Sequence, residues 1–216
     1  MDGIRLVIFD LDGTLIDAYQ AIYRSFNRTM GEAGYPARPE RVIRRAVGWG
    51  DRNLLKPFVR EADLDRVLEI YRKDHIKSLP RWSRLLPGVR RLLTALRKRG
   101  YRLAVASNRP TRFSLTLLRE CGIKKDFDAV LCGDRVSRGK PDPEMIRRIM
   151  ARLKMRPGQT LYVGDMFIDV QAARRARVRS AAVLTGSSTR SELAREKPDL
   201  LLGKAADLQK VLPAAN

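Results

Sequence analysis

The hydrophobic positions of this 216-residue chain form short apolar runs, which alternate with stretches where apolar and charged residues recur every three or four positions. Short apolar runs predict buried strands, and the three-to-four-residue spacing predicts amphipathic helices. Strands that alternate with helices are typical of a parallel sheet covered by helices on both faces. The apolar runs lie at 6–9, 103–106, 129–131, 160–163, 181–184 and, more weakly, 199–202.

About ninety residues separate the first two predicted strands, more than a single crossover helix needs. We therefore predict an α/β fold, a doubly wound parallel sheet with a Rossmann-like core at 1–16 and 80–216 and an inserted helical cap domain at 17–79. The segments that join the two, after residue 15 and at 79–88, would serve as hinges. Helical patterns separated by glycines and an acidic turn fill the insertion, at 18–33, 39–46, 51–59 and 64–76.

The composition, with 44% hydrophobic residues, is sufficient for a full core. No continuous apolar run approaches the ~20 residues that span a bilayer, and the chain opens directly into the first predicted strand, so we expect a cytoplasmic protein with no membrane partner. The two cysteines, Cys121 and Cys132, have neither disulfide-framework numbers nor metal-site spacing. His75, the lone histidine, lies in a charged helical pattern, and we expect it at the surface.

The formal net charge of +20 raises the hypothesis of a nucleic-acid partner. Residues 16–80 carry a net charge of +4 and the rest of the chain carries +16. In that larger part the basic residues alternate with Leu, Ile and Met at helical spacing, which is typical of solvated helix faces. No basic tail or zinc-finger spacing accompanies them, so we expect no specific nucleic-acid partner. A basic nucleic-acid-binding protein remains the alternative from another functional class, and a monomer and a homodimer both remain open.

Two aspartates end the first predicted strand, Asp10 and Asp12, and Gly13 and Thr14 follow them directly. Alternate side chains of a strand point to the same face, so the two carboxylates project together. Carboxylates held that close repel each other unless a cation or a shared proton relieves them. This pattern predicts a divalent metal site or a pair made of a nucleophile and an acid/base group.

Further polar residues lie just beyond later strands. Ser107 and Asn108 follow the 103–106 run, and a hydroxyl there can donate a hydrogen bond to an anionic oxygen. Lys140 lies in a loop before a helix, where a cation can neutralise charge on a phosphoryl oxygen. Asp165 ends the 160–163 run, and Asp169 follows one helical turn later. Functional groups of a doubly wound sheet gather beyond the carboxyl ends of its strands, so we expect these side chains to meet.

Four motifs resemble, in order and spacing, those of the haloacid dehalogenase superfamily of phosphohydrolases. They are DLDGT at 10–14, SN at 107–108, the lysine of GKPDP at 140 and GDMFID at 164–169. The resemblance extends over essentially the whole chain. It implies that Asp10 attacks phosphorus to form an aspartyl-phosphate. It implies that Asp12 protonates the leaving oxygen and later deprotonates the hydrolytic water.

The same resemblance implies a magnesium ion held by the carboxylates of Asp10 and Asp165 and the backbone carbonyl of Asp12, with Asp169 supporting the site. Hard oxygen ligands of this kind fit Mg²⁺ better than zinc. The residues that it assigns to phosphate binding are Thr14, Ser107, Asn108 and Lys140.

The substrate implied by the resemblance is a small anionic phosphorylated metabolite. Family members that cleave carbon–halogen bonds lack an aspartate at the position of Asp12, which favours a phosphatase, whereas sugar-phosphate mutases share every motif and remain the alternative. The pattern looks most like phosphoglycolate phosphatases, so phosphoglycolate is the leading substrate. Substrate choice is expected in the cap, where Arg45, Trp49 and Arg52 are candidates for a second anion contact. The alternative, that Trp49 is cap core and the arginines are solvent-exposed, remains open.

Overall fold

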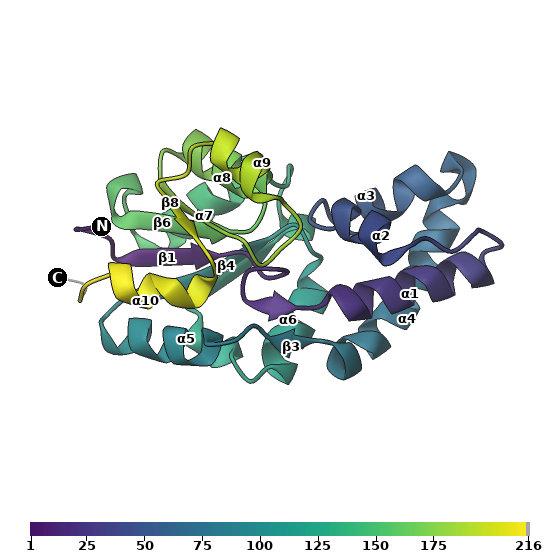
Figure 1. Ribbon diagram of the computed structural model, residues 1–216, viewed down its shortest axis with the longest axis horizontal. Helices are drawn as coiled ribbons and strands as arrows, with labels where there is room; N and C mark the ends of the chain where they lie inside the picture. Colours follow the sequence, from purple (N-terminus) through teal and green to yellow (C-terminus); the bar gives the residue numbers. More distant parts are fainter. Residues whose placement is uncertain (215–216) are drawn as a thin grey trace.

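The computed structural model in Figure 1 describes residues 1–214 and contains an α/β unit with a smaller helical unit at one end. The α/β unit holds a sheet of six strands in which every neighbouring pair is parallel. This confirms the predicted α/β class and doubly wound sheet. In sheet order the strands are β5 (Ala129–Cys132), β4 (Arg102–Ser107), β1 (Leu6–Phe9), β6 (Thr160–Gly164), β7 (Arg179–Val183) and β8 (Leu200–Leu202).

The two faces of the sheet are covered because successive side chains of each strand point to opposite sides. The helices of this unit are α5 (Val89–Lys98), α6 (Thr111–Glu120), α7 (Glu144–Leu153), α8 (Phe167–Ala176), α9 (Arg190–Arg195) and α10 (Leu208–Val211). In β1, Val7 and Phe9 belong to a hydrophobic cluster that includes residues of α5, α6 and α10, whereas Leu6 and Ile8 pack with residues of α7 and α8.

The helical unit has a hydrophobic cluster of its own, to which Phe26, Met30 and Tyr71 contribute. The predicted 51–59 helix is divided, since only Asp51–Leu55 is α-helical and a 3₁₀ turn follows. Pro57 lies in that turn, and its missing N–H cannot continue the α-helical hydrogen bonds. The helices are α1 (Tyr19–Glu32), α2 (Glu40–Ala46), α3 (Asp51–Leu55) and α4 (Leu64–Trp82). Whether 17–79 behaves as a separate domain stays a prediction.

The two connections between the units have more regular structure than the sequence pattern predicts, and their role as hinges stays a prediction. α4 runs six residues beyond its predicted end and includes Pro80, because a proline in the last turn removes only one hydrogen bond and the side chain of Leu79 is buried beside it. The connections also pair with each other as a short antiparallel sheet, β2 (Ile16–Asp17) with β3 (Arg84–Leu85), which the sequence pattern did not predict.

The longest helix, α4, has 19 residues and carries charged side chains along its length. Among the helices within residues 1–214, none is both long and apolar enough to cross a membrane.

Candidate functional site

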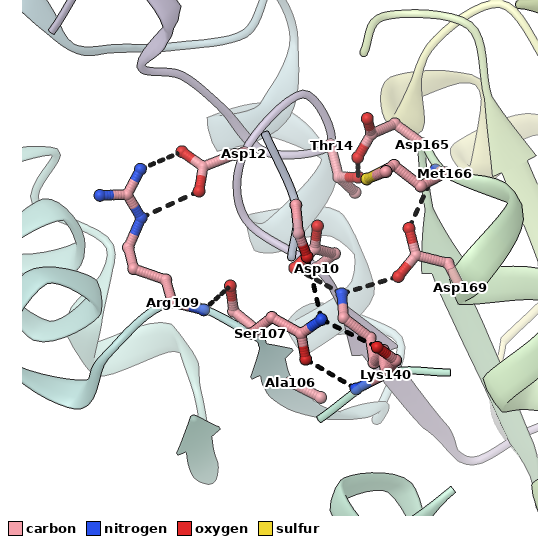
Figure 2. A network of polar contacts seen from close by, with 12 residues as sticks. Asp10, Asp12, Thr14, Ala106, Ser107, Arg109, Lys140, Asp165, Met166 and Asp169 are labelled. Carbon is pink, nitrogen blue, oxygen red and sulfur yellow. Dashed lines mark hydrogen bonds and ion pairs between the residues drawn. The ribbon is translucent and has the colours of Figure 1, made fainter. Parts of the chain in front are cut away.

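Three carboxylates meet beyond the carboxyl ends of β1 and β6, which are neighbours at the middle of the sheet. Asp10, Asp165 and Asp169 each offer an oxygen, and these oxygens lie within 4.8 Å of one another (Figure 2). All three residues are buried. The predicted acidic cluster is therefore present in the structure, and parallel strand order brings it together from two segments about 150 residues apart.

The electrostatics of this cluster are unfavourable without a cation. Burial raises the pKa of Asp10 to about 6, although Lys140 opposes the shift, and the charge of Asp169 adds to it. Burial and the charges of Asp169 and Asp10 raise the pKa of Asp165 well above its ordinary value. Lys140 Nζ lies 2.9 Å from Asp10 Oδ1 as an ion pair, but no residue within 1–214 donates a hydrogen bond to that buried oxygen. Three buried carboxylates with one ammonium group among them fit a hard divalent cation.

The orientation of Asp165 is fixed from both sides. Thr14 Oγ1 donates to Asp165 Oδ1 at 3.2 Å, and the backbone N–H of Ser187 donates to Asp165 Oδ2 at 3.0 Å. Thr14, expected to bind phosphate, thus has its hydroxyl hydrogen on a carboxylate. A phosphate contact by its side chain stays a prediction that this hydrogen bond does not favour.

Two glycines allow the loops after β1 and β7 to approach Asp165 closely. Gly13 has a φ of +75°, which L side chains rarely adopt, and a Cβ there would lie 2.7 Å from Gly186 Cα. A Cβ on Gly186 would lie 1.7 Å from Asp165 Oδ2. The sequence pattern did not single out Gly186, because only the tertiary structure places the loop after β7 against Asp165.

Lys140 lies between two of the carboxylates. Its Nζ is 2.7 Å from Asp169 Oδ1 in addition to its contact with Asp10, and its side chain is 2% exposed. Burial alone would lower its pKa, but the charges of Asp10 and Asp169 outweigh that effect and raise the pKa well above its ordinary value. The ammonium group therefore stays charged next to the proposed nucleophile.

Asn108 holds the Lys140 loop in place. Its Oδ1 accepts a hydrogen bond from the Lys140 backbone N–H at 2.7 Å, and its Nδ2 donates to the carbonyls of Lys140 and of Gly48 in the helical unit. Both amide hydrogens are thus used. The phosphate contact predicted for the Asn108 side chain stays a prediction, and the hydrogen bonds of its amide group disfavour it. Ser107, in contrast, lines the same cavity as Asp10.

An ion pair that the sequence pattern did not reveal holds Asp12. Arg109, which is 8% exposed, donates from Nε to Asp12 Oδ2 at 2.9 Å and from Nη2 to Asp12 Oδ1 at 2.7 Å (Figure 2). Its Nη1 lies 2.7 Å from His75 Nε2. Burial alone would lower the pKa of Arg109, but Asp12 outweighs that effect and raises it. The sequence offered one signal for a role of Arg109 in the site, namely its position directly after the SN motif.

The expectation that His75 lies at the surface is wrong, because its ring is 1% exposed. It stacks on Tyr71 and meets Phe113 edge-on. Burial, followed by the charge of Arg109, lowers the pKa of His75 well below its ordinary value, so the ring is neutral and Nε2 accepts from Arg109. The sequence contained a signal for this burial, because residues 68, 71, 75 and 79 are spaced to lie on one face of a helix. All four are buried in the structure.

A cavity of about 40 Å³ lies between the helical unit and the edge of the sheet. One part of its wall is polar, with the side chains of Asp10, Asp12, Ser107, Arg109 and His75. The rest is mainly apolar and comes largely from the helical unit, with Ile22, Val47, Leu54, Tyr71 and Phe113. The residues that carry the two predicted catalytic carboxylates therefore line the same cavity.

The cap residues expected to select the substrate lie outside this cavity. Arg45 forms an ion pair with Glu192 at 2.6 Å and donates to the carbonyl of Ser187 at 2.8 Å. Arg52 forms an ion pair with Asp65. Trp49, which is 37% exposed, lies against Phe167, with ring centroids 6.0 Å apart. A role of these three residues in specificity stays a prediction.

Known proteins are similar to this chain over most of its length. Residues 7–183 match the model of the haloacid dehalogenase-like hydrolases. A phosphoglycolate phosphatase of Nitrosospira multiformis is 36% identical over 182 residues, which cover 80% of each chain. One from Aquifex aeolicus is 29% identical and covers 97% of each chain.

Solved structures give the same result for the fold. A Haemophilus somnus protein described as a predicted phosphoglycolate phosphatase superposes with a TM-score of 0.91 at 28% identity, covering 98% of this chain and 99% of its own. The sheet, the buried carboxylates and these matches lead to one conclusion: the chain is an enzyme that belongs to the haloacid dehalogenase-like hydrolase family, and it is similar to the phosphoglycolate phosphatases of that family.

Proposed function

We propose that the protein is a magnesium-dependent phosphatase that hydrolyses a small phosphorylated metabolite, with phosphoglycolate as the leading substrate, through an aspartyl-phosphate on Asp10. The observation that carries this proposal is the buried cluster of Asp10, Asp165 and Asp169 around Lys140 at the carboxyl ends of β1 and β6. The relatives named above supply the substrate class.

In the first step a carboxylate oxygen of Asp10 attacks phosphorus while Asp12 gives a proton to the leaving oxygen. In the second step Asp12 takes a proton from the water that hydrolyses the aspartyl-phosphate. Lys140 and Ser107 neutralise or donate to the phosphoryl oxygens. Because Lys140 is within 2.9 Å of Asp10 Oδ1, its charge lies where negative charge accumulates.

The donor set supports magnesium as the metal. All three aspartates have a carboxylate oxygen that points into the cluster. The hydrogen bonds to Asp165 come from neutral donors, Thr14 Oγ1 and the Ser187 backbone N–H, whereas Asp169 Oδ1 accepts from the charged Nζ of Lys140. We therefore assign Asp10 and Asp165 as the direct ligands, with Asp169 in support and the Asp12 backbone carbonyl as a further ligand. The bound ion would polarise the phosphoryl group and offset the repulsion among the carboxylates.

We further propose that the helical unit acts as a cap, because the cavity between the two units is small. Its volume of about 40 Å³ is far below the roughly 300–1,000 Å³ of ligand pockets, so we propose that the units separate to admit a substrate. A cytoplasmic location and a monomeric or homodimeric state remain predictions from the sequence.

A phosphate-release assay with a panel of phosphometabolites tests the proposal. With Mg²⁺ present, phosphoglycolate is expected to give the highest kcat/KM, and a chelator is expected to stop the release. Asp10→Asn should be inactive, whereas Asp2→Asn, a change at an exposed position, should retain activity. No phosphate release from any phosphate monoester would contradict the proposal. Phosphoryl return to a sugar phosphate without net release would indicate the phosphomutase alternative.

A further inference from the structure

Both carboxylate oxygens of Asp12 accept hydrogen bonds from Arg109, whereas the proposed mechanism needs Asp12 free to transfer a proton. The guanidinium and the carboxylate form two parallel hydrogen bonds, and both side chains are nearly buried, at 7% and 11% exposure. In Figure 2 this pair lies on one side of Asp10, and Lys140 with Asp169 lies on the other. Asp12 cannot move toward a leaving group without giving up these bonds.

Separation of such a pair is costly if nothing replaces the lost partner. Removing one member of a buried ion pair leaves an uncompensated charge, which strongly destabilises the protein. If Asp12 leaves, the guanidinium of Arg109 therefore needs another anion. The neutral ring of His75 cannot supply it.

The cavity gives an anion access to Arg109. Among the described residues that line it, Arg109 is the single cationic side chain, whereas Asp10, Asp12 and Asp51 are acidic and most others are apolar. Asp10 lines the same space, so a phosphoryl group on Asp10 and a short tail directed at Arg109 share one cavity. A carboxylate is the tail group that matches the fork of guanidinium donors, because it accepts two parallel hydrogen bonds.

We propose that Arg109 binds a carboxylate of the substrate in place of Asp12. The exchange favours substrates that carry a carboxylate and frees the Asp12 carboxylate, which takes a proton from solvent and then gives it to the leaving oxygen. The inference rests on the proposed phosphatase function and narrows its substrate class to phosphate monoesters that carry a carboxylate near the phosphate. One anion replaces another on the same guanidinium, so the buried charge stays balanced.

His75 acts as a positioning residue in this exchange. Its Nε2 accepts from Arg109 Nη1 at 2.7 Å, and its Nδ1 lies 3.3 Å from Ser25 Oγ on α1. The third guanidinium nitrogen is thus fixed from the helical unit while the other two face the anion. Arg109 keeps its orientation when its anionic partner changes.

The test compares two substrates that differ in one group, phosphoglycolate and 2-hydroxyethyl phosphate, which has an alcohol in place of the carboxylate. The native enzyme should prefer phosphoglycolate in kcat/KM. In Arg109→Gln this preference should fall by roughly 10- to 100-fold, as expected for a hydrogen-bonded charge. The matched control is Arg112→Gln, which changes an exposed arginine three residues further along the chain, in the first turn of α6, and should keep the native preference.

Equal losses on both substrates in Arg109→Gln would overturn the proposal and leave Arg109 as a partner of Asp12 alone. The native enzyme provides a second measurement that needs no variant. With an aryl phosphate as substrate, glycolate should inhibit competitively and ethylene glycol should not. Equal inhibition by the two, or none by either, would also overturn the proposal. Phosphate release from phosphoglycolate by the native enzyme shows separately whether the proposed phosphatase function holds.

Discussion

Asp10 carries a charge that its buried surroundings disfavour. Its pKa in the folded protein is about 6, above its ordinary 3.8, so the folded protein is penalised for the ionised form above about pH 6. The penalty shrinks as the pH falls through 6 and disappears below 3.8. Without metal, Asp10→Asn should therefore be more stable than the native protein at pH 7.5 by roughly 1–3 kcal/mol, while it has no activity.

Chemical denaturation in the presence of a chelator measures this difference. The gain should shrink at pH 4.5, and Asp2→Asn, at an exposed position, should show no gain at either pH. An Asp10→Asn protein that is less stable than the native one at pH 7.5 would show that the Lys140 contact outweighs the cost of burial.

Gly186 allows the loop after β7 to lie against Asp165. In Gly186→Ala, the new Cβ would overlap Asp165 Oδ2, at 1.7 Å, so the carboxylate must move. Metal affinity should fall by about 10- to 100-fold, as for other changes that disturb a ligand's orientation. The matched control is Gly158→Ala, where a Cβ meets nothing within 4 Å. Titration of activity with Mg²⁺ gives the result, and the same half-saturating concentration in both variants would contradict it.

Among the secondary-structure elements, α2 holds the helical unit against the α/β unit through Arg45. Because its guanidinium is already paired with Glu192 and lies outside the cavity, Arg45→Ala should change kcat/KM for phosphoglycolate and for an aryl phosphate by the same factor. The stability loss should not exceed about 1 kcal/mol, as for other exposed ion pairs. Arg41→Ala, an exposed position on the same helix, is the control. A loss confined to phosphoglycolate would instead support the predicted specificity role.

For the molecule as a whole, metal binding should couple to folding and to pH. Mg²⁺ is expected to raise the Tm, because a cation relieves the repulsion among Asp10, Asp165 and Asp169. Since the pKa values of Asp10 and Asp165 are raised, protons compete with the metal more strongly at low pH. The Tm gain at a fixed Mg²⁺ concentration should therefore be larger at pH 8 than at pH 5.5. Thermal melts at both pH values measure this Tm gain. If Asp165→Ala kept the full gain, Asp165 would not be a metal ligand.

Sequence alone determined the strands and the position of the acidic cluster. The apolar run at 6–9 and the aspartates that follow are neighbours in the chain, so the end of β1 and its carboxylates were predictable together. The same holds for Asp165 after β6. Local periodicity decides such features, because a strand end and the next side chains are fixed by covalent order.

The tertiary structure alone decided the partners of these groups. Arg109 and Asp12 are 97 positions apart, and His75 joins them from the helical unit. The β2–β3 pair and the contact of Gly186 with Asp165 likewise join distant segments. Such contacts depend on the sheet order and on how the helical unit packs against the sheet edge. The sheet order and this packing depend on the burial of apolar side chains from the whole chain, and a local sequence pattern does not contain that information.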